Sequence, residues 1–211
     1  MAVTKEREAW DKLYSKRGLQ YGGSGHLGLL DRVLKPGMIV LDAGCGDGKT
    51  TEILAKKCDV VGCDFSKEAL ASLRSQRDPG RALDLVECNL TNLPFEPEKF
   101  NAITCVHALS HLSEEDRVHA SDELVRVLKQ EGHLMVEVFG KGDLRFGEGT
   151  EIEHSTFARG SGIMTHYFEE GEISGLLKGL EILLEIDSVR RVSYGARAGK
   201  RHIIRVFARK G

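Results

Sequence analysis

Short apolar runs rich in β-branched residues alternate with helix-period segments from Met38 onward, and this alternation constrains the fold more than any other feature. The runs expected as strands are 38–43, 59–64, 82–87, 101–106 and 133–138. Helices are expected between them over 50–57, 67–76 and 114–129, the last with Ser113 and Asp116 at capping-box spacing. Strands separated by helices pair in parallel, so the pattern predicts an α/β fold with helices on both faces of a mostly parallel sheet.

The pattern changes after Phe139. Residues 140–162 are polar and rich in glycine, and a segment of this length without periodicity is expected to be a lid or substrate loop. A helical apolar stripe follows at Ile173, Leu176, Leu177 and Leu180. Two alternating runs, 182–186 and 204–208, then flank a turn-like segment, 193–200, and predict a closing antiparallel hairpin.

Composition is that of a globular protein with one buried core: 211 residues, 41% hydrophobic and 29% charged. The charged start of the chain and the lack of any run near the roughly 18 apolar residues of a spanning helix predict a cytoplasmic protein that does not enter membranes. Five cysteines without a CxxC pair or a Cys/His zinc spacing predict reduced thiols and no metal site.

Positive charge is concentrated at the end of the chain. Residues 188–211 hold eight of the Lys and Arg side chains and no Asp or Glu, although the formal net charge of the whole chain is -2. Such segregation favours an anionic partner, and a basic edge strand that discourages aggregation explains it equally well.

The run VLDAGCGDGKT passes from the first expected strand into a helix through Gly44, Gly46 and Gly48. Three glycines leave no side chains between the backbone and a ligand, so a ligand is expected to approach the main chain closely. A dinucleotide fingerprint, GxGxxG, would need its third glycine at position 49, which is Lys49.

A phosphate-binding loop of NTPases is the stronger competitor, because Ala43 to Thr50 matches a loosened GxxxxGK[ST]. However, Asp42 and Asp47 would set negative charge beside a polyphosphate, where repulsion is costly. A methionine-derived cation has the opposite requirement, since its ammonium and sulfonium groups are favoured near a carboxylate such as Asp42. The two carboxylates therefore favour a methionine-derived cation over a nucleoside triphosphate as the ligand of this loop.

These residues resemble a known family. VLDAGCGDGKT is similar to the first motif of class I methyltransferases, and VVGCDFS at Val60 to Ser66 is similar to the motif that follows it. The resemblance implies S-adenosylmethionine as cofactor, with Gly44 and Gly46 along its methionine and ribose parts and Asp64 accepting hydrogen bonds from the ribose hydroxyls. A carboxylate at a strand end can accept from both hydroxyls of a diol.

The resemblance continues through ECNLTNLPFEPEKFNAITCVHALSHL and RVLKQEGHLMVEVF, and covers roughly residues 34–139. Asn89 stands where the family usually has Asp beside the adenine, and its side-chain carbonyl could still accept that hydrogen bond. The further cofactor contacts it implies are Cys45, Phe65, Leu90 and Val106, with Tyr21 in a glycine-rich segment covering the cofactor. The family's fold is a Rossmann-like, seven-stranded, mostly parallel sheet in which only the last strand is antiparallel.

This reading predicts a single domain over residues 1–211. Its parts are an N-terminal helical cap (1–33), a cofactor-binding half (34–139), a lid or substrate loop (140–167), and a closing helix and hairpin (168–211). Trp10 and Tyr14 share one face of the cap helix and are expected to pack as core.

Methyl transfer from a sulfonium is an in-line displacement that requires mainly alignment, so few catalytic residues are expected. VHAL follows the fourth strand in place of [DN]PP[YFW], and no Pro precedes a Cys, which disfavours exocyclic-amine methylation and covalent pyrimidine C5 methylation. The candidates for acid, base or acceptor-positioning roles are His107 and His111 after the fourth strand, and His154, Arg159, His166 and Tyr167 in and after the lid. Of these, His107, Arg159 and His166 are expected to act on the acceptor, and His111 is expected to pack.

Two acceptors remain open. GIMTHYFEEGEISGLL and the basic hairpin are similar to tRNA-modifying members, especially those that esterify a carboxymethyl group on a wobble uridine. There Arg159 and His166 would orient the carboxylate and the hairpin would meet phosphates, and by family analogy a small activating subunit would join. The alternative acceptor is a small metabolite enclosed by the lid. A non-catalytic cofactor-binding module is a third reading, against which the long lid argues.

Overall fold

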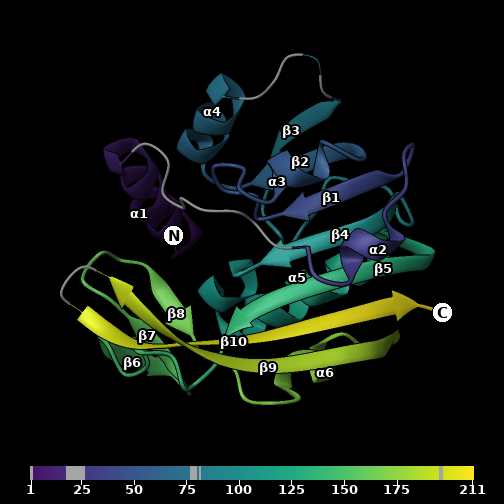
Figure 1. Ribbon diagram of the computed structural model, residues 1–211. Coiled ribbons are helices and arrows are strands. Elements are labelled where there is room, and N and C mark those ends of the chain that lie inside the picture. Colours follow the sequence, from purple (N-terminus) through teal and green to yellow (C-terminus); the bar gives the residue numbers. More distant parts are fainter. Residues whose placement is uncertain (1, 18–26, 77–79, 81, 195–196) are drawn as a thin grey trace.

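The computed structural model describes residues 2–17, 27–76, 80, 82–194 and 197–211. Its centre is a seven-stranded sheet (Figure 1). In spatial order the strands are β3 (Leu83–Glu87), β2 (Asp59–Asp64), β1 (Ile39–Ala43), β4 (Phe100–Val106), β5 (Leu128–Phe139), β10 (Arg197–Lys210) and β9 (Leu180–Tyr194). The expected seven-stranded α/β fold is confirmed.

Strand directions place the functional edge of the sheet. β1 pairs in parallel with both β2 and β4, whereas β10 is antiparallel to β5 and to β9. The chain moves outward from β1 to β3 and then returns to the other side of β1 as β4, so the strand order reverses between β1 and β4. In such sheets the carboxyl ends of the strands at the reversal form the crevice that binds ligands.

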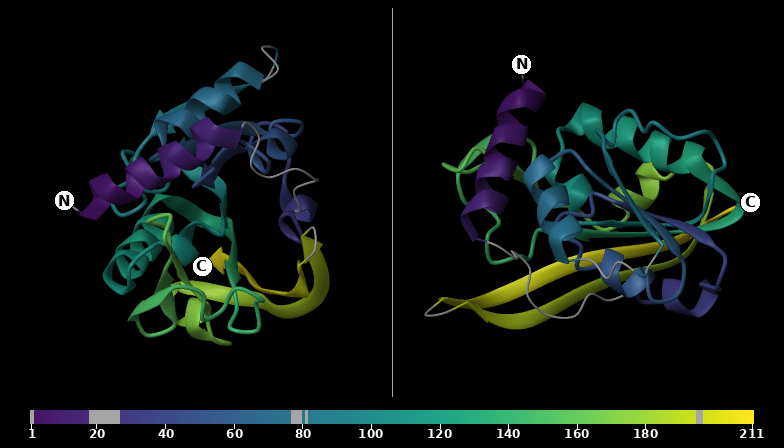
Figure 2. Two further views of the ribbon diagram at one scale, coloured as in Figure 1. Left: turned by 90° about the vertical axis from the view of Figure 1, so that its left-hand side faces the viewer. Right: turned by 90° about the horizontal axis from the view of Figure 1, so that it is seen from above.

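Helices cover both faces of the sheet (Figure 2). One face carries α2 (Leu30–Val33), α3 (Thr51–Leu54) and α4 (Lys67–Gln76), which contribute to one buried apolar cluster. The other face carries α5 (Glu114–Val127) and α6 (Glu172–Leu176), which contribute to a second. A 3-10 turn, η1 (Ala108–His111), follows β4, and α1 (Ala2–Arg17) begins the chain. Within the described ranges, no helix is long and apolar enough to cross a membrane.

The alternation of runs predicted β2 and α4 with the observed bounds, and β1, β3 and β4 to within one residue. At the start of α5, the backbone N–H of Asp116 donates to Ser113 Oγ at 3.2 Å, as the capping spacing predicts. The helices expected over 50–57 and around 173–180 are shorter than expected, because α-helical structure ends at Leu54 and at Leu176 and the chain turns into the next strand.

The polar segment after β5 is not an open loop. It contains a small antiparallel sheet of β6 (Thr150–Glu153), β7 (Thr156–Ala158) and β8 (Met164–His166). Strands of three or four residues are too short to show an alternating pattern in a sequence. Burial of Phe157 and Tyr167 against Phe139 and Ile203 holds the small sheet to the carboxyl end of β5.

The closing hairpin is longer than the sequence predicted, since β9 continues to Tyr194 and β10 begins at Arg197. Most of the segment expected as a turn therefore belongs to strands. Phe139, the last residue of β5, pairs with Ile203, and the hairpin continues past this point beyond the functional edge of the sheet (Figure 2). The basic residues near its far end are thus brought to the side of the molecule where ligands are expected.

Candidate functional site

The glycine loop after β1 has a backbone that requires glycine. Gly44, Gly46 and Gly48 have φ values of 72°, 54° and 95°, which side chains rarely adopt. A Cβ at Gly44 would lie 2.4 Å from the Cβ of Ala108 at the start of η1. The loop therefore packs closely against the turn that follows β4, at the point where the strand order reverses.

The backbone N–H groups of the glycine loop donate hydrogen bonds to the end of β2. The N–H groups of Gly44 and Cys45 donate to the carbonyl of Cys63 at 2.8 and 2.9 Å, and the N–H of Gly46 donates to Asp64 Oδ2 at 2.8 Å. A phosphate-binding loop directs successive amides at the ligand. Because these amides turn toward β2, the geometry argues against the NTPase interpretation.

Asp64 ends β2 beside this loop. Its other oxygen, Oδ1, accepts from the N–H of Ser66 at 2.9 Å, and its side chain is buried. Burial raises the pKa of Asp64 to about 6, against the lowering effect of the amides of Ser66 and Gly46. A buried carboxyl group thus lies beside the glycine loop, and its predicted role as acceptor for the ribose hydroxyls stays a prediction.

Asp42 lies beneath the loop. Its two oxygens accept hydrogen bonds from the hydroxyls of Thr51 and Thr104, at 2.6 and 2.8 Å. Burial raises the pKa of Asp42, and the two hydroxyls act in the opposite direction. The carboxylate therefore links β1 to α3 and β4, and its predicted approach to the cofactor ammonium stays a prediction.

The remaining predicted cofactor residues surround the same corner. Cys45 and Leu90 are buried, Phe65 and Val106 are half-buried at the ends of β2 and β4, and Asn89 Oδ1 accepts from the N–H of Thr91 at 3.1 Å. Their contacts with a cofactor stay predictions. Tyr21 lies outside the described residues.

Helix α1 lies against this corner. A Cβ at Gly46 would be 2.6 Å from the hydroxyl oxygen of Tyr14, so the buried Tyr14 ring packs against the loop. Ser66 Oγ donates to Asp11 at 2.6 Å, and Arg7 pairs with Glu87 at 3.1 Å. These contacts fix α1 to the ends of β2 and β3.

A second group of side chains lies at the ends of β4 and β5. His107, with φ of 62°, stacks on Phe139 with ring centroids 4.1 Å apart, and its Nε2 is 3.3 Å from Glu137 Oε1. Burial lowers the pKa of His107 well below its usual value, with smaller contributions from His111 and Arg201. His107 is therefore a neutral imidazole at pH 7.

Two arginines also surround Phe139. The guanidinium carbons of Arg145 and Arg201 lie 5.0 and 5.1 Å from the centre of its ring. Asp143, whose side chain is fully buried, pairs with Arg145 at 3.4 Å and with Arg201 at 3.2 Å. Two cations share one carboxylate, so this end of the site has a local excess of positive charge.

Comparison with known protein families identifies the domain that contains this site. A family described as a methyltransferase domain matches residues 40–132, which include the glycine loop, Asp64 and Asn89. The chain contains a class I methyltransferase domain. S-adenosylmethionine is the methyl donor typical of this family.

Relatives of this methyltransferase domain include tRNA-modifying enzymes. The chain is 32% identical over 158 residues to the tRNA N(3)-methylcytidine methyltransferase Mettl2 of Drosophila melanogaster, covering 69% of this chain and 48% of that protein. It is 36% identical over 107 residues to a tRNA (carboxymethyluridine(34)-5-O)-methyltransferase of Arabidopsis thaliana, covering 50% of this chain and 25% of that one. The chain thus spans about half the length of the first relative and less of the second.

Solved structures agree on the fold. A methyltransferase of Methanosarcina mazei superposes with a TM-score of 0.73 at 23% identity, over 89% of this chain and 99% of that one. At this identity the similarity shows a shared methyltransferase fold.

The three residues expected to act on the acceptor do not form one group in the structure. His107 belongs to the group around Phe139 at the ends of β4 and β5. In contrast, both ring nitrogens of the buried His166 are engaged, Nδ1 with Thr156 Oγ1 at 2.8 Å and Nε2 with Glu172 Oε1 at 2.7 Å. Arg159 donates to Thr165 Oγ1 at 3.2 Å. Roles for His166 and Arg159 at the acceptor stay predictions that these contacts do not favour.

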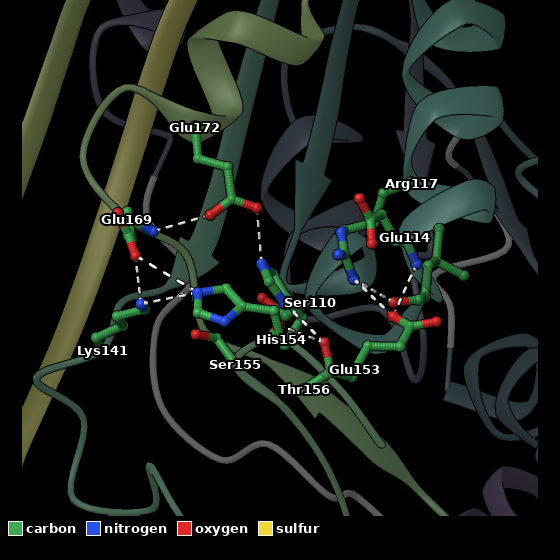
Figure 3. Close-up of polar contacts among 12 residues, drawn as sticks. Ser110, Glu114, Arg117, Lys141, Glu153, His154, Ser155, Thr156, Glu169 and Glu172 are labelled. Atoms are coloured by element: carbon green, nitrogen blue, oxygen red, sulfur yellow. Dashed lines mark hydrogen bonds and ion pairs between the residues drawn. The ribbon is translucent and has the colours of Figure 1, made fainter. Parts of the chain in front are cut away.

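The surroundings of His166 form a charged cluster between the small sheet and the helices α5 and α6 (Figure 3). Glu153 Oε2 accepts from the N–H of Glu114, at the first turn of α5, at 2.9 Å and lies 3.8 Å from Arg117. Lys141 pairs with Glu169. The dashed contacts in Figure 3 join the small sheet to both helices, so the cluster anchors this sheet.

The other histidine after β4, His111, packs as expected. Its Nδ1 lies 2.7 Å from the carbonyl oxygen of Met164, and its ring meets Trp10 edge-on at 4.8 Å. Burial lowers the pKa of His111 to about 4. His154 is largely exposed, and Tyr167 is buried against Phe139. No group of His, Cys, Asp and Glu in the described part is placed to hold a metal ion.

Arg145 and Arg201 are residues that sequence reasoning missed as a pair. Arg145 lies in the polar segment expected as a lid, and Arg201 was counted only among the basic residues at the end of the chain. Neither position has a motif around it. Their meeting at Phe139 depends on the pairing of β10 with β5, which no local pattern encodes.

Proposed function

We propose that this chain transfers a methyl group from S-adenosylmethionine to a nucleotide of tRNA. The observation that carries the proposal is the similarity of the cofactor-binding half to tRNA methyltransferases, joined to a basic hairpin beside the same edge of the sheet. The corner offers the donor a polar partner, because the Asp64 carboxylate at the end of β2 could also accept hydrogen bonds from ribose hydroxyls.

The donor, when bound, supplies an activated methyl group on a sulfonium. Asp64 would hold the ribose, and the ring of Tyr14 would limit the access of water from the side of α1. Stacking on Phe139 fixes the ring plane of His107 at the end of β4. These side chains would align donor and acceptor for an in-line displacement, which accounts for most of the acceleration such a reaction needs.

The acceptor end favours an anionic group. Arg145 and Arg201 would share a carboxylate of the acceptor, for which the excess positive charge around Asp143 provides the attraction. A carboxylate is nucleophilic without a base, as the carboxymethyl group of a modified uridine would be. If the acceptor atom carries a proton instead, the neutral imidazole of His107 would be the group to receive it, and its lowered pKa would make it a weak base.

Exposed cations on the hairpin support tRNA as the carrier of the acceptor. Four of the basic residues at the end of the chain form ion pairs within the molecule: Arg201, Arg205, Arg209 and Lys210. In contrast, Arg190, Arg191 and Lys200 are exposed beyond the end of β5. Exposed Lys and Arg beside an acceptor site are the side chains that bind nucleic-acid phosphates.

The experiment is transfer of radiolabelled methyl from S-adenosylmethionine into bulk tRNA and, separately, into a small-metabolite extract. Label in tRNA is expected, and Arg190→Glu and Lys200→Glu should each weaken tRNA binding and lower its salt dependence by about one phosphate contact. Label only in the extract would contradict the tRNA proposal. Label in neither would contradict transfer by the chain alone and favour a cofactor-binding module or an enzyme that needs a small activating subunit.

A small metabolite is the second candidate acceptor. It is favoured by the burial of Phe157 and Tyr167 with Phe139, which encloses the acceptor end on the side of the small sheet. An enclosed aromatic site suits a small planar acceptor as well as a single extruded base.

The anionic acceptor group has its own test. Arg145→Met should raise the KM for the labelled acceptor by about tenfold or more, because a charge-assisted hydrogen bond is lost, and should leave the affinity for S-adenosylmethionine unchanged. Arg74→Met, which changes an exposed arginine in the last turn of α4, is the matched control. An unchanged KM in Arg145→Met would remove the arginine pair from acceptor binding.

A further inference from the structure

Strand β9 presents an apolar edge. In the described part of the chain it pairs with β10 on one side and with no strand on the other. It carries five of the large apolar side chains that remain exposed: Ile182, Leu183, Leu184, Ile186 and Val189. Long edge strands with exposed apolar side chains are normally covered, because their free N–H and C=O groups bind other strands.

Both faces of this edge are apolar. On the α2 face, Leu184 and Ile186 line a groove of about 340 Å³ together with Leu29, Met135 and Phe207. Val189, with 52% of its surface exposed, belongs to the opposite face, because successive residues of a strand alternate. A partner that covers the edge must therefore bury side chains on both faces, as another β-strand does.

Acidic and basic side chains occupy different halves of β9. Its first half carries Glu181, Glu185 and Asp187, and its second half carries Arg190 and Arg191. Parallel pairing of two such strands would place like charges together. Antiparallel pairing of the strand with itself would place the acidic half opposite the basic half.

We propose that β9 pairs with β9 of a second copy of this chain, antiparallel about a two-fold axis at Val189. This register sets Asp187 opposite Arg191 and Ile186 opposite Val192, and paired residues share a face because their numbers differ by an even amount. Asp187 and Arg191 are both exposed. The two sheets then form one continuous sheet in which residues 184–194 of each β9 are paired.

Neighbouring pairing registers place like charges, or charged and apolar side chains, opposite each other. An axis at Asp187 sets the two Asp187 carboxylates opposite each other, where like charges are destabilising. An axis at Ser188 sets Asp187 opposite Val189 and Ile186 opposite Arg190. The axis at Val189 matches apolar with apolar and acid with base at the same time.

The test is a charge swap followed by sedimentation equilibrium of the full chain. Wild-type protein is expected as a dimer. Arg191→Glu and Asp187→Arg should each raise the dimer dissociation constant by about tenfold, because each places like charges opposite one another twice. An equimolar mixture of the two variants should recover a heterodimer, since both of its contacts then join opposite charges.

Arg190→Glu is the matched control, because residue 190 lies opposite Ser188 on the other face and the dimer should persist. The Arg191→Glu side chain is solvent-exposed, so this variant is expected to fold, which circular dichroism checks. A wild-type monomer at every concentration, a dimer that Arg191→Glu leaves intact, or a mixture that stays monomeric would each overturn the proposal. Methyl transfer plays no part in this measurement, so its outcome does not depend on the function proposed above.

Discussion

Asp64 gives the cofactor corner a pH dependence. Its pKa of about 6 means that the carboxylate is ionised at pH 7 and protonated in an increasing fraction of molecules below pH 6. If two ribose hydroxyls donate to the ionised form, affinity for S-adenosylhomocysteine should be nearly full above about pH 7, decline through pH 6 and approach a fall of about tenfold per unit at lower pH. Calorimetric titration at several pH values measures this, and Asp64→Asn should flatten the profile. A wild-type affinity that does not change with pH would contradict the role of Asp64.

Gly44 is expected to tolerate no side chain. Gly44→Ala combines the cost of a positive φ, about 1–2 kcal/mol, with a Cβ placed 2.4 Å from the Cβ of Ala108, which cannot move without its backbone. Gly37→Ala is the control, because it has a φ of 81° and no heavy atom within 4 Å of the added Cβ. Urea denaturation should show a larger loss of unfolding free energy for Gly44→Ala, and equal losses would show that the loop can relax.

At the scale of elements, the small sheet β6–β7–β8 depends on its anchor. His166→Ala removes a ring bonded to Thr156 and Glu172, so the free energy of unfolding should fall by about 1–3 kcal/mol while kcat of the folded enzyme stays within about twofold. His154→Ala, whose side chain is 81% exposed in the same cluster, should change neither quantity. A large loss of kcat in a stable His166→Ala protein would return His166 to the catalytic residues.

Elements with a strong local signal could be predicted from the sequence. The strands β1 to β4, helix α4 and the cap of α5 follow from buried β-branched runs, helical spacing and Ser113. Asp64 could also be predicted, because it lies a fixed distance after the glycine loop. These features are encoded by residues close together in the chain.

Elements that depend on contacts distant in the sequence could not be predicted. The short strands of the small sheet are held by burial of Phe157 against β5 and by Glu153 at α5. Arg145 and Arg201 come together because of the register in which β10 pairs with β5. The sequence of the predicted lid contains no pattern that indicates this contact. His166 was a catalytic candidate because it is a polar side chain at the end of the expected lid, and its contact with Glu172 depends on the packing of α6 against β8, which no local pattern encodes.

At the scale of the whole molecule, the hairpin has two roles in this account. Its far end carries Arg190 and Lys200 toward tRNA, and its outer edge pairs with a second copy through Val189 and Arg191. Arg190→Glu should therefore weaken tRNA binding and keep the dimer, whereas Arg191→Glu should dissociate the dimer. Arg190→Glu thus tests the tRNA surface alone, whereas Arg191, which is also one of the exposed cations, is the residue whose replacement changes the dimer.

The central claim is that the corner formed by the glycine loop and Asp64 binds the methyl donor. Isothermal titration of the full chain with S-adenosylhomocysteine tests it most directly, with Asp64→Asn compared with Asp59→Asn at the exposed start of the same strand. One site per chain is expected, with affinity about tenfold to a hundredfold weaker in Asp64→Asn and unchanged in Asp59→Asn. No binding by folded wild-type protein, or equal binding by both variants, would contradict the claim.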